Sequence, residues 1–281
     1  MTRTLSLGYS PCPNDTFIFG ALAEGRIDPS PLAFKIFMAD VEVLNRKAGA
    51  GELDVTKVSV SAVVRLLEDY WMLRAGGAMG RGCGPLVVSR AALSPGELRR
   101  RSLAIPGKLT TAHLLLRLEG SHQGPVFEMP FDQIMPRTVA GEVDAGLIIH
   151  EGRFTYPSMG LKSVLDLGSW WESRWGVPLP LGAILIRREL GPEIARTVEE
   201  RIRRSLNHAR NHPEEVWPYI RDHAQEMEPS VIERHIEMFV NEFSLDVGEE
   251  GERAVRTLLR EASLLENIPL PNKPLFWDQE D

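Results

Sequence analysis

His150 is the histidine whose neighbours in the sequence argue most clearly for chemistry. It directly follows an apolar run, residues 145–149, and precedes Glu151 and Gly152. A short apolar run that ends in polar residues and glycine is typical of a buried strand and its exit loop. Ligands of open α/β sheets bind beyond the carboxyl ends of the strands. The pattern therefore predicts that His150, whose imidazole titrates near neutral pH, meets a bound small molecule.

Familiar catalytic motifs do not explain this histidine. The pair His150-Glu151 begins like the zinc-protease motif HExxH, but the second histidine position is occupied by Phe154. The serine-nucleophile motif GxSxG is absent, and Cys12 has a proline on each side and no histidine near it in the sequence. A lone histidine at a strand end is more often a hydrogen-bonded structural residue than a general base. The residues alone leave both interpretations open.

A second group of polar residues lies in the predicted strand over residues 54–60. Lys57 and Ser59 are two positions apart, so they share one face of that strand. A lysine inside a short strand is more often an edge residue or one whose charged end reaches solvent. The alternative is a ligand contact made from the strand end together with Ser59 and Ser61.

A third candidate is the pair Thr110 and Thr111, which begins a predicted helix over residues 110–118. The free backbone N–H groups of a helix start, two hydroxyl groups and the nearby Lys108 would suit a carboxylate or a phosphate. Simple capping accounts for one threonine and leaves the second unexplained. Helix capping and anion binding both remain open.

The elements that must position these residues alternate along the chain. Predicted strands cover residues 5–9, 32–38, 54–60, 102–105, 126–129, 145–150 and 178–187, and predicted helices cover residues 16–24, 62–69, 110–118, 132–141, 192–212, 213–227, 229–241 and 249–265, with a further helix beginning after Asp40. This order predicts an α/β protein of two lobes with a cleft between them and a helical C-terminal segment. The expected large lobe is 1–97 plus 188–281, and the expected small lobe is 98–187.

Three further segments have their own expectations. Residues 76–84 contain five glycines without a nucleotide-binding motif, which favours a flexible connection near the cleft. Trp170, Trp171 and Trp175 predict a core or a pocket wall. The histidines of the C-terminal helices are expected at the surface. His208 and His212 are four residues apart and could bind a metal together, but no carboxylate or cysteine motif supplies the other ligands. These helical histidines are His208, His212, His223 and His235.

Composition limits the possible partners. The 281 residues are 43% hydrophobic and 25% charged, with a net charge of −7, which disfavours nucleic acid and anionic membranes as partners. Cys12 and Cys83 form no metal or disulfide pattern, and no apolar run of membrane-spanning length occurs. A cytoplasmic protein with a small-molecule ligand is therefore expected, while its oligomeric state cannot be predicted.

Seven segments resemble one known enzyme family, the 1,4-dihydroxy-6-naphthoate synthases of the futalosine route to menaquinone. They are residues 7–17 (LGYSPCPNDTF), 40–45 (DVEVLN), 56–59 (TKVS), 76–88 (GGAMGRGCGPLVV), 146–156 (GLIIHEGRFTY), 179–184 (LPLGAI) and 243–251 (FSLDVGEEG). They are spread over nearly the whole chain. Two positions depart from the family pattern: Leu109, and Gly152, where a serine is common.

The resemblance implies a periplasmic-binding-protein-like fold of type 2 with mixed sheets, used as a carbon–carbon lyase without a metal or redox cofactor. The substrate would be cyclic dehypoxanthinylfutalosine, which carries a carboxylate. The general base of the family falls on His150. The implied substrate contacts are Lys57, Val58, Ser59, Thr110 and Thr111. Two rival functions remain: chorismate dehydratase of the same pathway, and a non-catalytic small-molecule binding protein.

Overall fold

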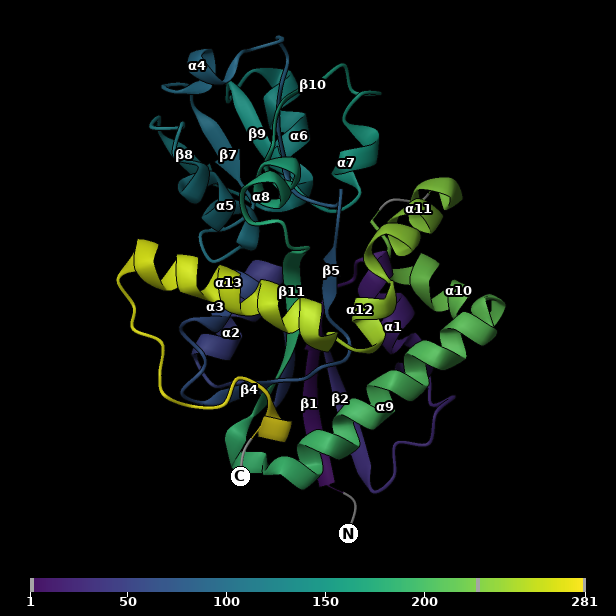
Figure 1. The fold of residues 1–281 in the computed structure, drawn as a ribbon. Coiled ribbons are helices and arrows are strands. Elements are labelled where there is room, and N and C mark those ends of the chain that lie inside the picture. The colour runs from purple at the N-terminus through teal and green to yellow at the C-terminus, as the bar shows by residue number, and fades with distance from the viewer. Residues whose placement is uncertain (1–2, 226–227, 280–281) are drawn as a thin grey trace.

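The computed structural model of the chain describes residues 3–225 and 228–279, and it has two lobes (Figure 1). The large lobe is built on one mixed sheet with strand order β2-β1-β3-β11-β4, and β5 also pairs with β11. Its strands are β1 (Arg3–Tyr9), β2 (Leu32–Met38), β3 (Val55–Ser59), β4 (Tyr70–Met72), β5 (Ala78–Gly80) and β11 (Leu179–Arg187). β1 runs parallel to β2 and β3, whereas β11 is antiparallel to β3, β4 and β5.

The small lobe is built on a second mixed sheet with strand order β10-β6-β9-β7-β8. Its strands are β6 (Leu86–Ser89), β7 (Leu103–Ile105), β8 (Val126–Glu128), β9 (Ala145–Ile148) and β10 (Lys162–Asp166). β7 is parallel to β8 and β9, and β6 is antiparallel to β9 and β10. The predicted α/β fold with two mixed sheets is confirmed.

The helices begin and end where local chemistry favours it. The helix predicted after Asp40 is present, and the carboxyl group of Asp40 caps it by accepting a hydrogen bond from the backbone N–H of Glu42. Gly120, Gly141 and Gly176 each end a helix in the left-handed conformation. The helices are α1 (Pro13–Ala23), α2 (Val41–Gly49), α3 (Val60–Val63), α4 (Pro95–Leu98), α5 (Thr111–Glu119), α6 (Phe131–Ala140), α7 (Gly152–Thr155), α8 (Leu167–Trp175), α9 (Pro192–Asn211), α10 (Pro213–His223), α11 (Pro229–Phe239), α12 (Glu242–Leu245) and α13 (Gly248–Glu266), with short 3₁₀ turns at Arg188–Leu190 and Trp277–Gln279.

Some predicted elements differ from the structure. The helix expected over 62–69 is a single turn, α3, followed by hydrogen-bonded turns. The helix expected over 213–227 ends at His223, and residues 226–227 lie outside the described residues. The glycine-rich segment contains a strand, β5, rather than a purely flexible connection.

The sheets also divide the chain at other positions than the expected lobe boundaries. β6 lies before residue 98 but forms hydrogen bonds with β9 and β10, so it belongs to the small-lobe sheet. β11 ends at residue 187 but pairs with β3, β4 and β5 of the large lobe. Strand pairing, which local sequence patterns do not specify, therefore shifts both boundaries toward the N-terminus, to positions before β6 and before β11.

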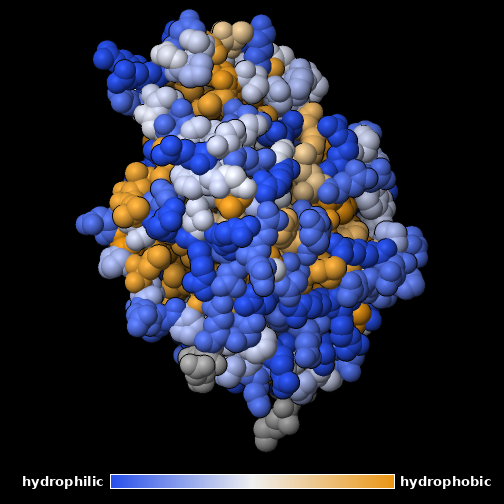
Figure 2. Space-filling model, in the orientation of Figure 1, coloured by the Kyte–Doolittle hydropathy of each residue, from blue (hydrophilic) through white to orange (hydrophobic). Residues whose placement is uncertain are grey.

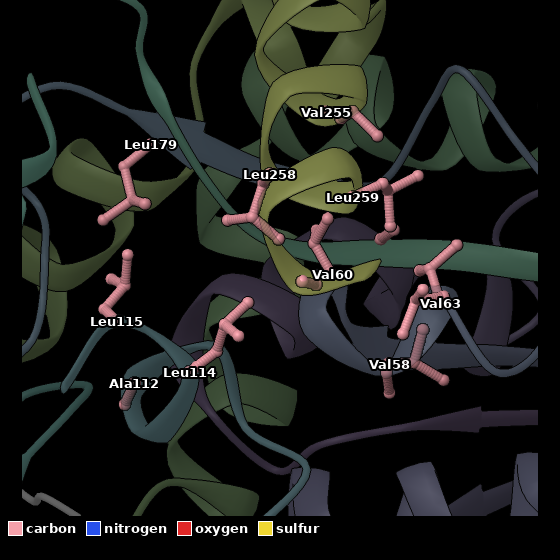
Figure 3. Close-up of a cluster of buried hydrophobic side chains, with 14 of the residues drawn as sticks. Val58, Val60, Val63, Ala112, Leu114, Leu115, Leu179, Val255, Leu258 and Leu259 are labelled. Carbon is pink, nitrogen blue, oxygen red and sulfur yellow. The ribbon is translucent and has the colours of Figure 1, made fainter. Parts of the chain in front are cut away.

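Apolar packing joins the two lobes. One cluster of buried side chains lies between the large-lobe sheet and helices α1, α9, α10 and α11. A second includes residues from α3, α13 and β11 together with α5 and α8 (Figure 3). Trp171 is completely buried in this second cluster, and its indole N–H donates to the carbonyl oxygen of Pro178. The tryptophan-rich segment is therefore part of the core.

The surface is largely polar on the face seen in Figure 2. Exposed apolar side chains include Leu264, Leu265 and Leu270, at and just beyond the end of α13. Within residues 3–225 and 228–279, no helix combines the length and the apolar character that crossing a membrane requires.

Candidate active site

A cavity lies between the lobes, with about 710 Å³ of space not filled by atoms when its mouth is included. Both lobes and their connections contribute to its wall. The large-lobe residues are Ser10, Asn14, Asp15, Val41, Lys57, Ser59, Ala78, Leu181, Gly182 and Phe239. The remaining residues are Cys83, Gly84, Pro85, Thr110, Thr111, Ala112, Ile149, His150 and Arg153. Polar groups inside a largely apolar wall are what a small-molecule site needs.

His150 lies on the cavity wall just after β9, which ends at Ile148. Its backbone is in the left-handed conformation with φ 57°, which non-glycine residues rarely adopt. The imidazole lies between two aromatic rings, with its centroid 4.7 Å from that of Phe131 and 6.2 Å from that of His235. Such strained conformations persist where the surrounding structure holds them, and they concentrate at functional sites.

Burial lowers the pKa of His150 from its ordinary value of 6.5 to about 4. The carboxylate of Asp15 opposes this shift, and the ammonium group of Lys57 reinforces it. At neutral pH the ring is therefore uncharged, with one nitrogen free to accept a proton. The structure gives His150 the protonation state that a general base needs.

Lys57 forms a buried ion pair at the cavity wall. It is 4% exposed on β3, a central strand between β1 and β11, so the edge-strand interpretation is wrong. Its ammonium nitrogen lies 2.5 Å from Oδ1 of Asp15. Asp15 also accepts hydrogen bonds from the backbone and hydroxyl of Ser10 and from the side-chain amide of Asn14. The first turn of α1, together with Ser10 just before it, thus supplies a polar wall of the cavity.

Val58 and Ser59 point in opposite directions because neighbouring side chains alternate along a strand. Ser59 lines the cavity, and its backbone N–H and hydroxyl are held by the side-chain amide of Asn45 at 2.8 and 3.1 Å. The Val58 side chain is completely buried in the apolar cluster drawn in Figure 3 and is not among the cavity-lining residues. A substrate contact at Val58 would therefore have to use its main chain.

The two threonines have different structural partners. Thr110 caps α5 by accepting a hydrogen bond from the backbone of His113. The hydroxyl of Thr111 donates to the carbonyl oxygen of Leu181 on β11 and accepts from the backbone N–H of Ser61. Interlobe hydrogen bonds therefore explain the second threonine, and both residues still line the cavity.

His235 lies behind two residues of the cavity wall, His150 and Asn14, and sequence reasoning missed this position. It was expected at the surface, but it is completely buried on α11, and its Nε2 lies 2.9 Å from Oδ1 of Asn14. Its Nδ1 lies 3.5 Å from Oε2 of Glu151. The signal was present in the helical spacing, because Ile232 and Phe239 flank His235 on the same buried face of α11.

The remaining cavity residues limit the chemistry further. Burial raises the pKa of the Cys83 thiol to about 12, so it is protonated at neutral pH and a poor nucleophile. Arg153 is tied to Asp166 and to the carbonyl oxygen of Gly84. No tryptophan is among the described residues that line this cavity. The apolar part of its wall includes Val41, Ile149, Leu181 and Phe239.

Two lobes that enclose a small-molecule cavity define the class of fold. The chain is similar to an alkanesulfonate-binding protein from Xanthomonas axonopodis pv. citri bound to MOPS, with a TM-score of 0.72 at 14% identity, covering 95% of this chain and 94% of that one. That likeness shows the periplasmic-binding-protein-like fold. A crystal structure of an Archaeoglobus fulgidus protein is more similar, with a TM-score of 0.88 at 36% identity, covering 95% of this chain and 98% of that one.

Sequence relatives then give the family. A family model described as menaquinone biosynthesis matches residues 5–263. A 1,4-dihydroxy-6-naphthoate synthase from Thermus thermophilus is 53% identical over 98% of this chain and 99% of its own length. One from Streptomyces coelicolor is 46% identical over 95% of each chain. The chain belongs to this family of menaquinone-biosynthesis enzymes, which confirms the resemblance.

Proposed function

We propose that the chain converts cyclic dehypoxanthinylfutalosine to 1,4-dihydroxy-6-naphthoate, with His150 as the general base. The observation that carries this proposal is the uncharged imidazole of His150 on the wall of the interlobe cavity. Family membership supports the choice of substrate, because relatives with nearly full coverage carry the name of this synthase.

The proposed reaction begins with proton transfer from a sugar-derived hydroxyl of the substrate to His150. The resulting alkoxide becomes a carbonyl as the adjacent carbon–carbon bond breaks, in the manner of a retro-aldol reaction. The electron pair of that bond passes to the ring system, which takes the proton back from His150, and the fragment leaves as a small dihydroxy-carbonyl compound. Formation of the aromatic naphthalene favours this direction, so neither a metal nor a redox cofactor is required by the electron balance.

The substrate in this proposal carries a carboxylate that binds at the start of α5. Thr110 and Thr111 line the cavity there, and the positive end of the helix dipole favours an anion. The ring system would lie against the apolar wall that includes Val41, Ile149 and Phe239. Lys57 and Ser59 would complete the polar contacts from β3. We also propose a cytoplasmic location, because two free buried cysteines suit a reducing compartment.

Replacing the base tests the proposal. His150→Asn keeps a residue type that tolerates the left-handed conformation but removes the base. We expect kcat to fall by about 10²- to 10⁴-fold, the usual contribution of general base catalysis, while substrate still binds by calorimetry. His212→Asn, at an exposed position, is the matched control. Turnover of His150→Asn at the wild-type rate would exclude the base role.

Two rival functions are separated in the same assay. Incubation of the wild-type protein with chorismate, followed by loss of its cyclohexadiene absorbance as water leaves and the ring becomes aromatic, would indicate chorismate dehydratase. Tight binding of cyclic dehypoxanthinylfutalosine without any product would indicate a binding protein. Release of 1,4-dihydroxy-6-naphthoate is the result expected here.

A further inference from the structure

We propose that His235 and Glu151 form a latch between the lobes that positions His150 for proton transfer. This inference rests on the proposed function for the identity of the base. His235 belongs to α11 in the C-terminal part of the large lobe, whereas Glu151 is the residue directly after His150. The pair therefore connects the large lobe to the backbone that carries the base.

The hydrogen-bond network determines which nitrogen of His235 carries the proton. The side-chain amide of Asn14 donates its N–H to the carboxylate of Asp15, which can only accept. Oδ1 of Asn14 is therefore an acceptor, and Nε2 of His235, at 2.9 Å, must be the donor. Burial, with smaller contributions from His150 and Lys57, lowers the pKa of His235 well below its ordinary value. The ring thus carries one proton at neutral pH, on Nε2.

The same assignment determines the state of Glu151. With the proton on Nε2, Nδ1 of His235 is an acceptor, and it faces Oε2 of Glu151 at 3.5 Å. Two buried acceptors would repel each other, so a proton must lie between them. We assign that proton to the carboxyl group of Glu151, which then donates to Nδ1. Glu151 is 9% exposed and His235 is completely buried, so this contact is largely shielded from water.

This latch acts on the strained backbone of His150. A left-handed conformation at a histidine costs free energy and persists only where neighbouring contacts hold it. The contact with His235 holds Glu151, the residue directly after His150, while the rings of Phe131 and His235 lie next to the imidazole of His150. Because His235 on α11 contacts Glu151 from the other lobe, the relative placement of the lobes and the orientation of the base are linked. His235 and Glu151 are positioning residues in this arrangement.

A neighbouring contact between α11 and the segment that follows Glu151 provides the control. The guanidinium group of Arg234, on α11, lies 4.5 Å from the ring centroid of Phe154, on α7. Arg234 is exposed, and among the described residues it is not part of the hydrogen-bond network of Asn14, His235 and Glu151. Arg234→Ala removes a contact between α11 and α7 while leaving the latch itself intact.

Substitutions at Glu151 separate positioning from packing. Glu151→Gln supplies an N–H donor to Nδ1 in place of the carboxyl proton, so kcat should stay within about threefold of wild type. Glu151→Leu and His235→Phe keep volume but remove the hydrogen bond. We expect kcat to fall about 10²-fold in both, the usual effect of displacing a catalytic group by about 1 Å, with KM within about threefold. Arg234→Ala should leave kcat within about twofold.

Imidazole ¹⁵N chemical shifts test the latch without turnover. In wild-type protein with labelled histidines, the signals that disappear in His235→Phe identify His235. We expect a protonated Nε2 and an unprotonated Nδ1. A proton on Nδ1, or wild-type kcat in folded Glu151→Leu, would overturn the latch. If the wild-type protein makes no product from cyclic dehypoxanthinylfutalosine, the proposed function fails, and the ¹⁵N shifts still decide the arrangement of the latch.

Discussion

The buried pair of Lys57 and Asp15 allows one prediction to be worked out in detail. Lys57→Met removes the ammonium group and leaves the Asp15 carboxylate at 2% side-chain exposure. Breaking one partner of a buried pair costs about 3–5 kcal/mol. Asp15 keeps three hydrogen-bond donors, from Ser10 and Asn14, so we expect the lower end, about 3 kcal/mol.

Thermal unfolding converts this cost to a measurable shift. An unfolding entropy of about 2.1 cal/mol/K per residue, taken over 281 residues, makes 3 kcal/mol correspond to a loss of about 5 °C in Tm. The double variant Lys57→Met/Asp15→Asn removes both charges and should recover most of the loss. Lys35→Met, at an exposed position of β2 in the same sheet, is the control and should leave Tm within about 1 °C.

Lys57→Met should also change the pKa of His150. The charge on Lys57 lowers the pKa of His150 and that on Asp15 raises it, so removing Lys57 alone should raise the pKa of His150 above about 4. Titration of the His150 imidazole by NMR measures this directly. A Tm of Lys57→Met equal to that of wild type, or a double variant that loses as much as the single one, would refute the reasoning.

Two further predictions concern pH and the support of β9. Because the pKa of His150 is lowered from 6.5 to about 4, the unfolded chain binds more protons than the folded chain between these pH values. The resulting contribution to stability, about 3 kcal/mol, is complete above pH 6.5 and lost as the pH falls to 4. The acid limb of kcat/KM, which reports the free enzyme, should lie near pH 4, so a limb near 6.5 would contradict the assignment. A methyl group at Gly146 would lie 2.5 Å from Cγ2 of Ile134, so Gly146→Ala should lower the free energy of unfolding by about 1–3 kcal/mol, measured with denaturant. Gly49 has open space around it, so the control Gly49→Ala should not destabilise the protein. Equal stabilities of the two variants would refute the packing argument.

Much of the fold could be predicted because the signals are local. Alternating and apolar runs predicted β1, β2, β3 and β11, and spacing of 3.6 residues predicted the long helices α9 and α13. The lobe boundaries could not be predicted, because they depend on which distant strands pair. The short strand β5 escaped prediction because glycines obscure the strand pattern of its segment.

In the candidate site, too, the local patterns predicted the residues themselves but not their distant partners. Lys57, Ser59, Thr110, Thr111 and His150 all line one cavity, although three separate segments supply them. The partners that set their chemistry lie far away in the sequence. Local patterns do not predict that Asp15 pairs with Lys57 or that His235 is buried against Asn14, because neither burial nor a hydrogen bond between distant segments is visible in a local pattern.

The position of β11 has a consequence for how the chain folds during synthesis. β11 lies between β3 and β4 in the large-lobe sheet, although the whole small-lobe sheet separates it from them in the chain. The ribosome therefore releases every strand of the small lobe before the strand that completes the large one. We expect the small-lobe sheet to form first, while the edge of β3 that later pairs with β11 stays unpaired. Long-range strand pairing of this kind folds slowly and exposes unpaired edges, so this stage is the one that most needs protection from aggregation.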